Sequence, residues 1–181
     1  MTVIPTKDKE HPILFSGAMV RAVLNESKTQ TRRVIKVSPF DSCDEGLGVH
    51  ALVDIDKCPY GKAGDRLWVR ETFLSYLERT FYRATDEGDL LDSLFQTGKP
   101  KWKPSIFMPR SHSRIDLEVT GIRVERLNDI SEEDAIAEGI KNHLPTPKDA
   151  YQDLWDSING ETAPWDSNPW VWVVEFKICQ P

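Results

Sequence analysis

The sequence is poor in the features that mark secreted and membrane-spanning proteins. Its 181 residues contain three cysteines, Cys43, Cys58 and Cys179, and no Cys-x-x-Cys pair. An odd number of widely spaced thiols argues against a disulfide framework or a zinc ribbon and predicts reduced cysteines in the cytoplasm. The longest uninterrupted apolar run, around 170–174, is far too short to cross a membrane. The polar segment 1–12 has no apolar signal-peptide core, so we expect no export and no membrane partner.

Common site motifs are missing as well. The chain has no Gly-x-Gly-x-x-Gly, no P-loop, no His-Glu-x-x-His and no Gly-x-Ser-x-Gly. Its four histidines are scattered, and none pairs with a cysteine or a carboxylate at ligand spacing: His11, His50, His112 and His143. We therefore expect neither a metal nor a cofactor.

Positive charge is sparse but concentrated. The net charge is −6, yet two stretches, 27–40 and 99–114, contain nine lysines and arginines and no acid. Two basic segments on an acidic chain are typical of a confined anion site rather than of a wide DNA-binding face. Two solvated loops are the alternative interpretation.

The pattern of apolar residues predicts one domain over 1–181. We expect strands at 29–37, 65–73, 80–85, 114–126 and 170–178, and helices at 17–27, 131–139 and 147–159. Segment 38–64 is predicted to be mostly loop with a short apolar piece at 49–55. Segment 86–113 is predicted to be an insertion with a short helix at 90–95. Strands and helices do not alternate regularly, so the prediction is an α+β fold: a small mixed β-barrel of about five or six strands with about three helices.

Three details sharpen this prediction. The apolar phase of 114–126 shifts across Gly121, which predicts a β-bulge that bends the strand. The strand 170–178 is apolar on both faces, which places it inside the sheet rather than at an edge. Glu71 falls on the apolar face of its strand, where a buried carboxylate needs a partner or a raised pKa.

The segment after the first predicted helix carries a family resemblance. Lys28, Thr31 and Arg33 fit the last three positions of Gly-x-Lys-x-x-Thr-x-Arg, and Glu26 stands at the glycine position. This run resembles the signature of the ASCH family. Further segments resemble that family in order, namely 64–67, 130–139 and 174–176. The segments 58–61, 67–71 and 108–110 are similar to the larger ASCH-like proteins of phages and prophages, although 111–114 departs from their pattern. The resemblance spans roughly residues 13–178.

The resemblance implies a PUA-like barrel with a cleft beside the first helix that handles RNA or modified nucleosides. Small bacterial ASCH proteins include N4-acetylcytidine amidohydrolases, whose Lys, Thr and Glu fall on Lys28, Thr31 and Glu138. Thr31 would then be the nucleophile, Lys28 its base, and Glu138 the group that orients or relays protons. Family membership does not fix the reaction. A non-catalytic RNA or modified-base binding module, a ribonuclease, and an accessory protein that acts through protein contacts stay open.

The residues themselves set conditions on such a site. Lys28 and Thr31 are three apart, so they face opposite sides of a straight strand and cooperate only across a bend. Lys28 can act as a base only if burial lowers its pKa, whereas Glu138 nearby would raise it. Without the resemblance, all three are read as ordinary solvated or strand residues.

A second set of side chains is suited to binding. Arginines offer paired donors to a phosphate or a base edge, and here they are Arg33, Arg70, Arg110 and Arg114. Trp68 or Trp102 could stack on a base, with core packing as the alternative, and Glu71 completes the candidate set. We predict that Arg33, Arg110 and Arg114 converge on one face with Lys28.

Overall fold

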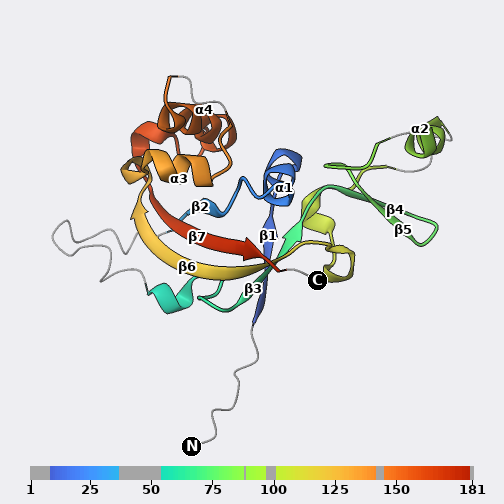
Figure 1. Cartoon of the computed structure of the whole chain (residues 1–181), viewed down its shortest axis with the longest axis horizontal. Helices are drawn as coiled ribbons and strands as arrows, with labels where there is room; N and C mark the ends of the chain where they lie inside the picture. The colour runs from blue at the N-terminus through green and yellow to red at the C-terminus, as the bar shows by residue number, and fades with distance from the viewer. Residues whose placement is uncertain (1–8, 37–53, 88, 97–100, 142–144, 180–181) are drawn as a thin grey trace, which may run out of the picture.

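The structure, a computed structural model, describes residues 9–36, 54–87, 89–96, 101–141 and 145–179. A five-stranded mixed sheet forms the body, in the order β1-β3-β6-β7-β2 (Figure 1). Its strands are β1 (Glu10–Leu14), β2 (Gln30–Val34), β3 (Arg66–Arg70), β6 (Asp116–Arg126) and β7 (Trp170–Ile178). β1 is parallel to β3, and the other neighbouring pairs are antiparallel. The α+β class predicted from the sequence is confirmed.

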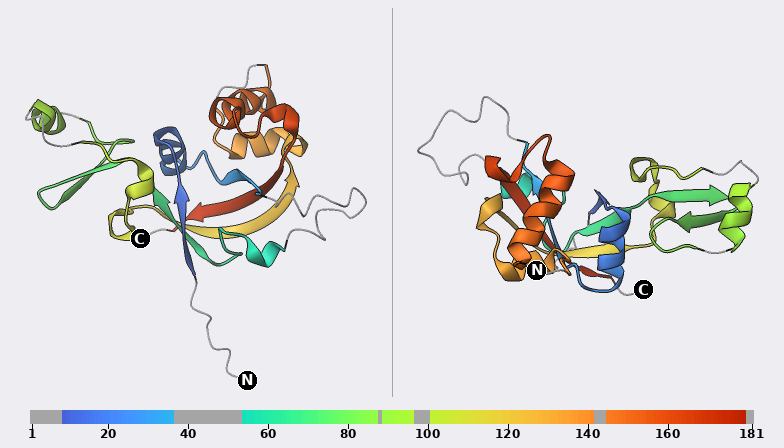
Figure 2. Two further views of the ribbon diagram at one scale, coloured as in Figure 1. Left: turned by 180° about the vertical axis from the view of Figure 1, so that it is seen from behind. Right: turned by 90° about the horizontal axis from the view of Figure 1, so that it is seen from above.

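An arm projects from this body (Figure 2). It contains the hairpin of β4 (Phe73–Tyr76) and β5 (Arg79–Tyr82) and the helix α2 (Asp89–Gln96). Leu74, Phe81 and Leu91 form a small core of its own. The arm overlaps the predicted insertion 86–113, and α2 agrees with the helix expected at 90–95.

Each of the remaining helices begins directly after a capping residue whose side chain accepts a backbone hydrogen bond. They are α1 (Gly17–Leu24), α3 (Glu132–Ala137) and α4 (Pro147–Asn159). The side chains of Ser131 and Thr146 accept hydrogen bonds from backbone N–H groups three residues on, and Pro147 takes the first position of α4. Short 3₁₀ turns link the elements: η2 (Ile55–Lys57), η3 (Ser105–Phe107), η4 (Arg110–His112), η5 (Leu127–Asp129) and η6 (Trp165–Ser167).

β7 is buried on both faces, as predicted. Trp172, Val174 and Phe176 enter the main core together with α1, while Val171 and Val173 enter a second core beneath α3 and α4. A strand covered on both sides has to be central, and β7 lies between β6 and β2.

The predicted bulge is present in β6. The register with β7 shifts between Val119 and Gly121, so that Thr120 is the extra residue. A Cβ at Gly121 would lie 2.7 Å from Oε2 of Glu175 on β7, at the flexible end of that side chain. The bulge lets β6 and β7 curve together toward α3 and α4 (Figure 1).

The sheet is not a closed barrel, and this corrects the sequence prediction. β1 and β2 are its two edges and share no strand pairing. The segment between them is α1, whose Val20 and Val23 are completely buried in the main core. A helix therefore covers the core where a barrel would have a further ladder of strand hydrogen bonds.

Other boundaries also differ from prediction. β1 was not predicted, because Pro12 argues against a strand; as an edge strand, β1 tolerates it. The run 65–73 divides into β3 and the start of β4, since the chain leaves the sheet at Glu71 to enter the arm. Most of the apolar piece 49–55 lies outside the described residues. Within the described part of the chain, no helix has the length and apolar character to span a membrane.

Candidate functional site

The turn after α1 places Lys28 beneath the end of α3. Glu26 has φ 60°, the left-handed conformation that favours glycine, so it keeps the backbone shape expected at the glycine position of the ASCH signature. The backbone N–H groups of Ser27 and Lys28 both donate to the carbonyl of Ala22. Lys28 thereby starts an extended segment that continues into β2.

The C-terminal end of α3 meets this segment directly. Lys28 Nζ donates to Glu138 Oε2 at 2.5 Å and to the Glu138 carbonyl at 2.9 Å, and Thr29 N–H donates to the Ala137 carbonyl. Gly139 has φ 93°, and a Cβ there would come within 3.2 Å of Lys28 Cβ. A cation at the carbonyl end of a helix also offsets the unfavourable dipole that Glu138 experiences there.

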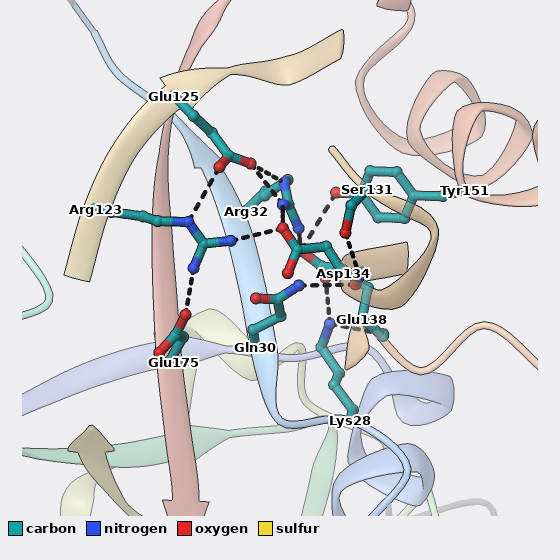
Figure 3. Close-up of polar contacts among 10 residues, drawn as sticks. All are labelled: Lys28, Gln30, Arg32, Arg123, Glu125, Ser131, Asp134, Glu138, Tyr151 and Glu175. Atoms are coloured by element: carbon teal, nitrogen blue, oxygen red, sulfur yellow. Dashed lines mark hydrogen bonds and ion pairs between the residues drawn. The ribbon is translucent and has the colours of Figure 1, made fainter. Parts of the chain in front are cut away.

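Arg32 is the second cation on Glu138. Its Nη1 donates to Glu138 Oε1 at 3.2 Å, and its Nη2 lies 2.5 Å from Glu125 Oε1 and 2.7 Å from Asp134 Oδ2. The Arg32 side chain is fully buried, so it depends on these partners for its charge. Figure 3 shows Arg32 at the centre of the group, with Lys28 and Gln30 on the same side of β2.

Arg123 extends the group along β6 and β7. It contacts Asp134 at 2.6 Å and Glu125 at 3.1 Å, and it also forms an ion pair with Glu175 (Figure 3). We call the whole set the charge network: Lys28, Arg32, Arg123, Glu125, Asp134, Glu138 and Glu175. Its three cations face four carboxylates. Since each cation already has an acidic partner, the network is not a preformed anion site.

Burial shifts the pKa of groups in this network. Desolvation lowers the pKa of Lys28, and this outweighs the raising effect of Glu138. Desolvation also raises the pKa of Tyr151 well above its ordinary value; its hydroxyl lies 3.5 Å from Glu138 Oε1. The lowered pKa of Lys28 is the direction that a general base needs, and the condition set from the sequence is therefore met.

Thr31 lies apart from Lys28 and Glu138. Lys28, Gln30 and Arg32 all reach toward α3. Alternation along the strand directs Thr31 to the other face, where Ile35 enters the main core. Thr31 is also only 1% exposed. The structure brings together two of the three predicted catalytic residues, and the bend needed to join Thr31 to them is not formed.

A cleft of about 310 Å³ lies beside the end of α1. It lies between the turn at Lys28 and the end of β7, and it is lined by Val23, Glu26, Lys28, Thr29, Phe176, Lys177 and Ile178. Its apolar floor and charged residues are typical of sites for small polar-edged molecules. The cleft lies beside the first helix, where the resemblance implied one.

The predicted arginines do not converge with Lys28. The Arg33 charge acts on Lys28, but its guanidinium donates to the Leu14 carbonyl, whereas Arg110 pairs with Glu10 and Asp116. Glu10 and Leu14 are opposite ends of β1, about 13 Å apart at strand spacing. Sequence patterns could not show that Arg33 and Arg110 lie apart, because the distance between their partners is the length of β1.

Arg114 and Arg70 lie at the base of the arm. Arg114 forms a two-point ion pair with Glu71, at 2.9 and 3.0 Å, so the buried Glu71 has the partner that the sequence required. Arg70 lies over the ring of Trp68, 5.4 Å from its centroid, and donates to the Ile106 carbonyl. Trp68 is half-buried beneath Arg70.

Sequence reasoning missed most of the charge network. Arg32, Arg123, Glu125 and Asp134 come from β2, β6 and α3, and no local motif joins them. The one available signal is alternation: Lys28, Gln30 and Arg32 are spaced by two, and so are Arg123 and Glu125. Among the described residues, no group of three or more His, Cys, Asp or Glu side chains is arranged to hold a metal ion.

Comparisons with known proteins add the following. No family model matches the sequence, and no curated protein matches it. One similar crystal structure is a protein of Enterococcus faecalis V583 described with the family DUF984. It is 11% identical with a TM-score of 0.46, and the match covers 96% of this chain and 82% of that one. Another is an ASCH domain from Lactobacillus crispatus JV V101, 11% identical with a TM-score of 0.45, over 94% and 79% of the two chains. Both are similarities of fold alone.

Proposed function

We propose that the chain binds a nucleoside, free or as part of an RNA strand, in the cleft beside α1. The observation that carries this proposal is the cleft itself, with Lys28 in its wall and a volume suited to one nucleoside. The ASCH resemblance of the Lys28 segment independently favours RNA or a modified nucleoside as the ligand class.

The chemistry of the lining fits a nucleobase. Of the apolar lining residues, Ile178 is partly exposed and can meet the face of a planar ring, whereas Val23 and Phe176 are buried in the core. The exposed Thr29 offers polar atoms for its edge. Binding needs no free cation inside the site, and this agrees with the closed charge network, in which Lys28 Nζ is already bonded twice to Glu138.

The cleft is tested by filling it. Ile178→Trp places a large ring in the cleft wall from the last residue of β7. We expect it to lower the affinity for cytidine and N4-acetylcytidine at least ten-fold in equilibrium dialysis. Ile158→Trp on α4, at a position 53% exposed and outside the cleft lining, is the matched control and should leave the affinity unchanged. An Ile178→Trp protein that binds as well as wild type would overturn the proposal.

Hydrolysis of an N4-acylated cytidine is the second candidate, and the lowered pKa of Lys28 is the observation that favours it. With Thr31 on the other face of β2, the version that the geometry supports has Glu138 activate water. Glu138 takes a proton from the water, whose oxygen bonds to the acyl carbon. The carbon–N4 bond breaks as Lys28 donates its proton to N4, and Glu138 then passes the proton from water to Lys28 through their hydrogen bond. The Lys28 and Glu138 side chains are 1% and 4% exposed, which is why binding ranks first.

Acetate release from N4-acetylcytidine separates the two mechanisms. If Glu138 activates water, Glu138→Gln and Lys28→Met should each abolish release while Thr31→Val retains it. If Thr31 is the nucleophile, all three variants, and the Lys28→Met/Thr31→Val double variant, should be about equally inactive, because residues that act as a unit give non-additive losses. If wild type binds the nucleoside but releases no acetate, hydrolysis is rejected and the binding proposal stands.

A further inference from the structure

The arm has one face that the cleft does not use. Phe73 pairs with Tyr82 and Ser75 with Thr80 in the hairpin, so these four side chains point to the same side. His112 lies against this side, with its ring edge on Phe73 and Nδ1 3.3 Å from Thr80 Oγ1. The opposite side of the hairpin carries Leu74 and Phe81, which are buried against α2.

Two lysines lie along this face. Lys103 exchanges both backbone hydrogen bonds with Phe73, so it acts as a third strand position beside β4, and its Nζ lies 5.8 Å from the centroid of the Phe73 ring. Trp102 turns to the other side and contacts Phe95. Lys101 lies two residues before Lys103 in the chain and is exposed, so its side chain can reach the same side.

Arg114 completes the face at the base of the arm. Its guanidinium stacks on Tyr82, 4.0 Å from the ring centroid, and is held by Glu71. The side chain is 27% exposed while Glu71 is 2% exposed, so the carboxylate lies below and the cation toward solvent.

The two lysines of this face, Lys101 and Lys103, have no acidic partner among the described residues, and both are exposed. Two acids that act on Tyr82 of this face have other partners: Glu71 is paired with Arg114, and the Asp86 carboxylate accepts from Tyr82 N–H and Thr85. Exposed lysines with no acid beside them create a local positive potential on an acidic protein, and this potential attracts an anionic partner.

We propose that this face, formed by Lys101, Lys103, Arg114 and the polar side chains of Ser75 and Thr80, binds the phosphodiester backbone of a nucleic acid. The lysines supply mobile charges and Arg114 a fixed one, since its stacking and ion pair hold its orientation. Contacts of this kind position a strand without reading its sequence. The proposal shares only the ligand class with the proposed function, because the cleft residues play no part in it.

The test is a salt titration of oligonucleotide binding. Fluorescence anisotropy with a labelled 12-nucleotide RNA compares wild type with Lys101→Glu/Lys103→Glu. We expect at least a ten-fold loss of affinity at low salt, and a slope of log K against log salt reduced by about 1.4, at about 0.7 for each phosphate contact with a single strand. The same titration with single-stranded DNA and with duplex RNA shows which nucleic acid the face prefers.

Two further proteins make the result decisive. Lys57→Glu/Lys62→Glu changes the charge equally at exposed residues on the body, and it should bind within two-fold of wild type. Lys101→Gln/Lys103→Gln removes the charge without adding acid, and it should reduce the slope as well. Wild type that binds no oligonucleotide, or arm variants with the wild-type slope, would overturn the proposal. Nucleoside binding, measured in parallel with Ile178→Trp, reports on the cleft separately.

Discussion

At the scale of the residue, Glu138 is the carboxylate that joins Lys28, Arg32 and Tyr151. Lys28 and Arg32 each donate to one of its carboxylate oxygens, and the Tyr151 hydroxyl lies near the second. A carboxylate that is 4% exposed requires such partners, because burying an unpaired charge is very costly. Loss of either cation would leave Glu138 under-compensated, so the pair ties the Lys28 turn to α3 in addition to any chemical role.

Asp134 makes the stability of the network dependent on pH. Burial alone would raise the pKa of Asp134, but Gln30, Arg32 and Arg123 outweigh it and lower the pKa below the ordinary value of 3.8. A group with a depressed folded-state pKa contributes stability above its unfolded pKa and loses it as the pH falls toward the folded one. We therefore expect the urea midpoint of wild type to fall below about pH 4, and Asp134→Asn to lower the midpoint at pH 7 and to flatten that fall.

The exposed Asp166, in η6, supplies the comparison for this experiment. Asp166→Asn should reproduce the wild-type profile between pH 3 and pH 7. An Asp134→Asn profile as steep as that of wild type would show that other carboxylates carry the acid sensitivity.

At the scale of the element, the arm hairpin has an unfavourable turn. Leu77 and Glu78 have φ 45° and 61°, and two positive values are what a type I′ turn requires. Neither residue favours this conformation, and Leu77 is 78% exposed. Leu77→Asn/Glu78→Gly supplies the preferred pair, so we expect the hairpin to gain about 1 kcal/mol.

Amide hydrogen exchange in β4 and β5 measures the stability gained by the hairpin. A local measurement is needed because the arm has a small core separate from that of the body. Protection should increase in the Asn-Gly variant. Leu77→Ala removes the exposed side chain without favouring positive φ, so it should give no added protection. Equal protection in both variants would mean that the turn is not strained.

Helix ends, the bulge and the central strand were largely predictable, because each depends on residues within one short segment. The Ser131 and Thr146 caps, the Gly121 bulge and the central position of β7 all follow from residues within one segment. β1 was hidden by Pro12, which only an edge strand accommodates.

At the scale of the whole molecule, what could not be predicted depends on contacts between distant segments. The open sheet follows from α1 covering the core between the two edge strands, and the separation of Arg33 from Arg110 follows from the length of β1. Lys28 and Glu138 were paired by resemblance alone, across 110 residues of sequence. Residue types indicate which groups need partners, as for Glu71, but the fold determines which partners they receive.

The central claim is that a nucleoside binds in the cleft beside α1. The most direct measurement is the change in amide chemical shifts of the ¹⁵N-labelled protein on addition of cytidine and of N4-acetylcytidine. Binding in this cleft predicts saturable shifts concentrated at residues 23–29 and 176–178, with Thr29 and Ile178 among the largest, and none on the arm. Shifts that are absent at millimolar nucleoside, or that fall away from these two segments, would contradict it.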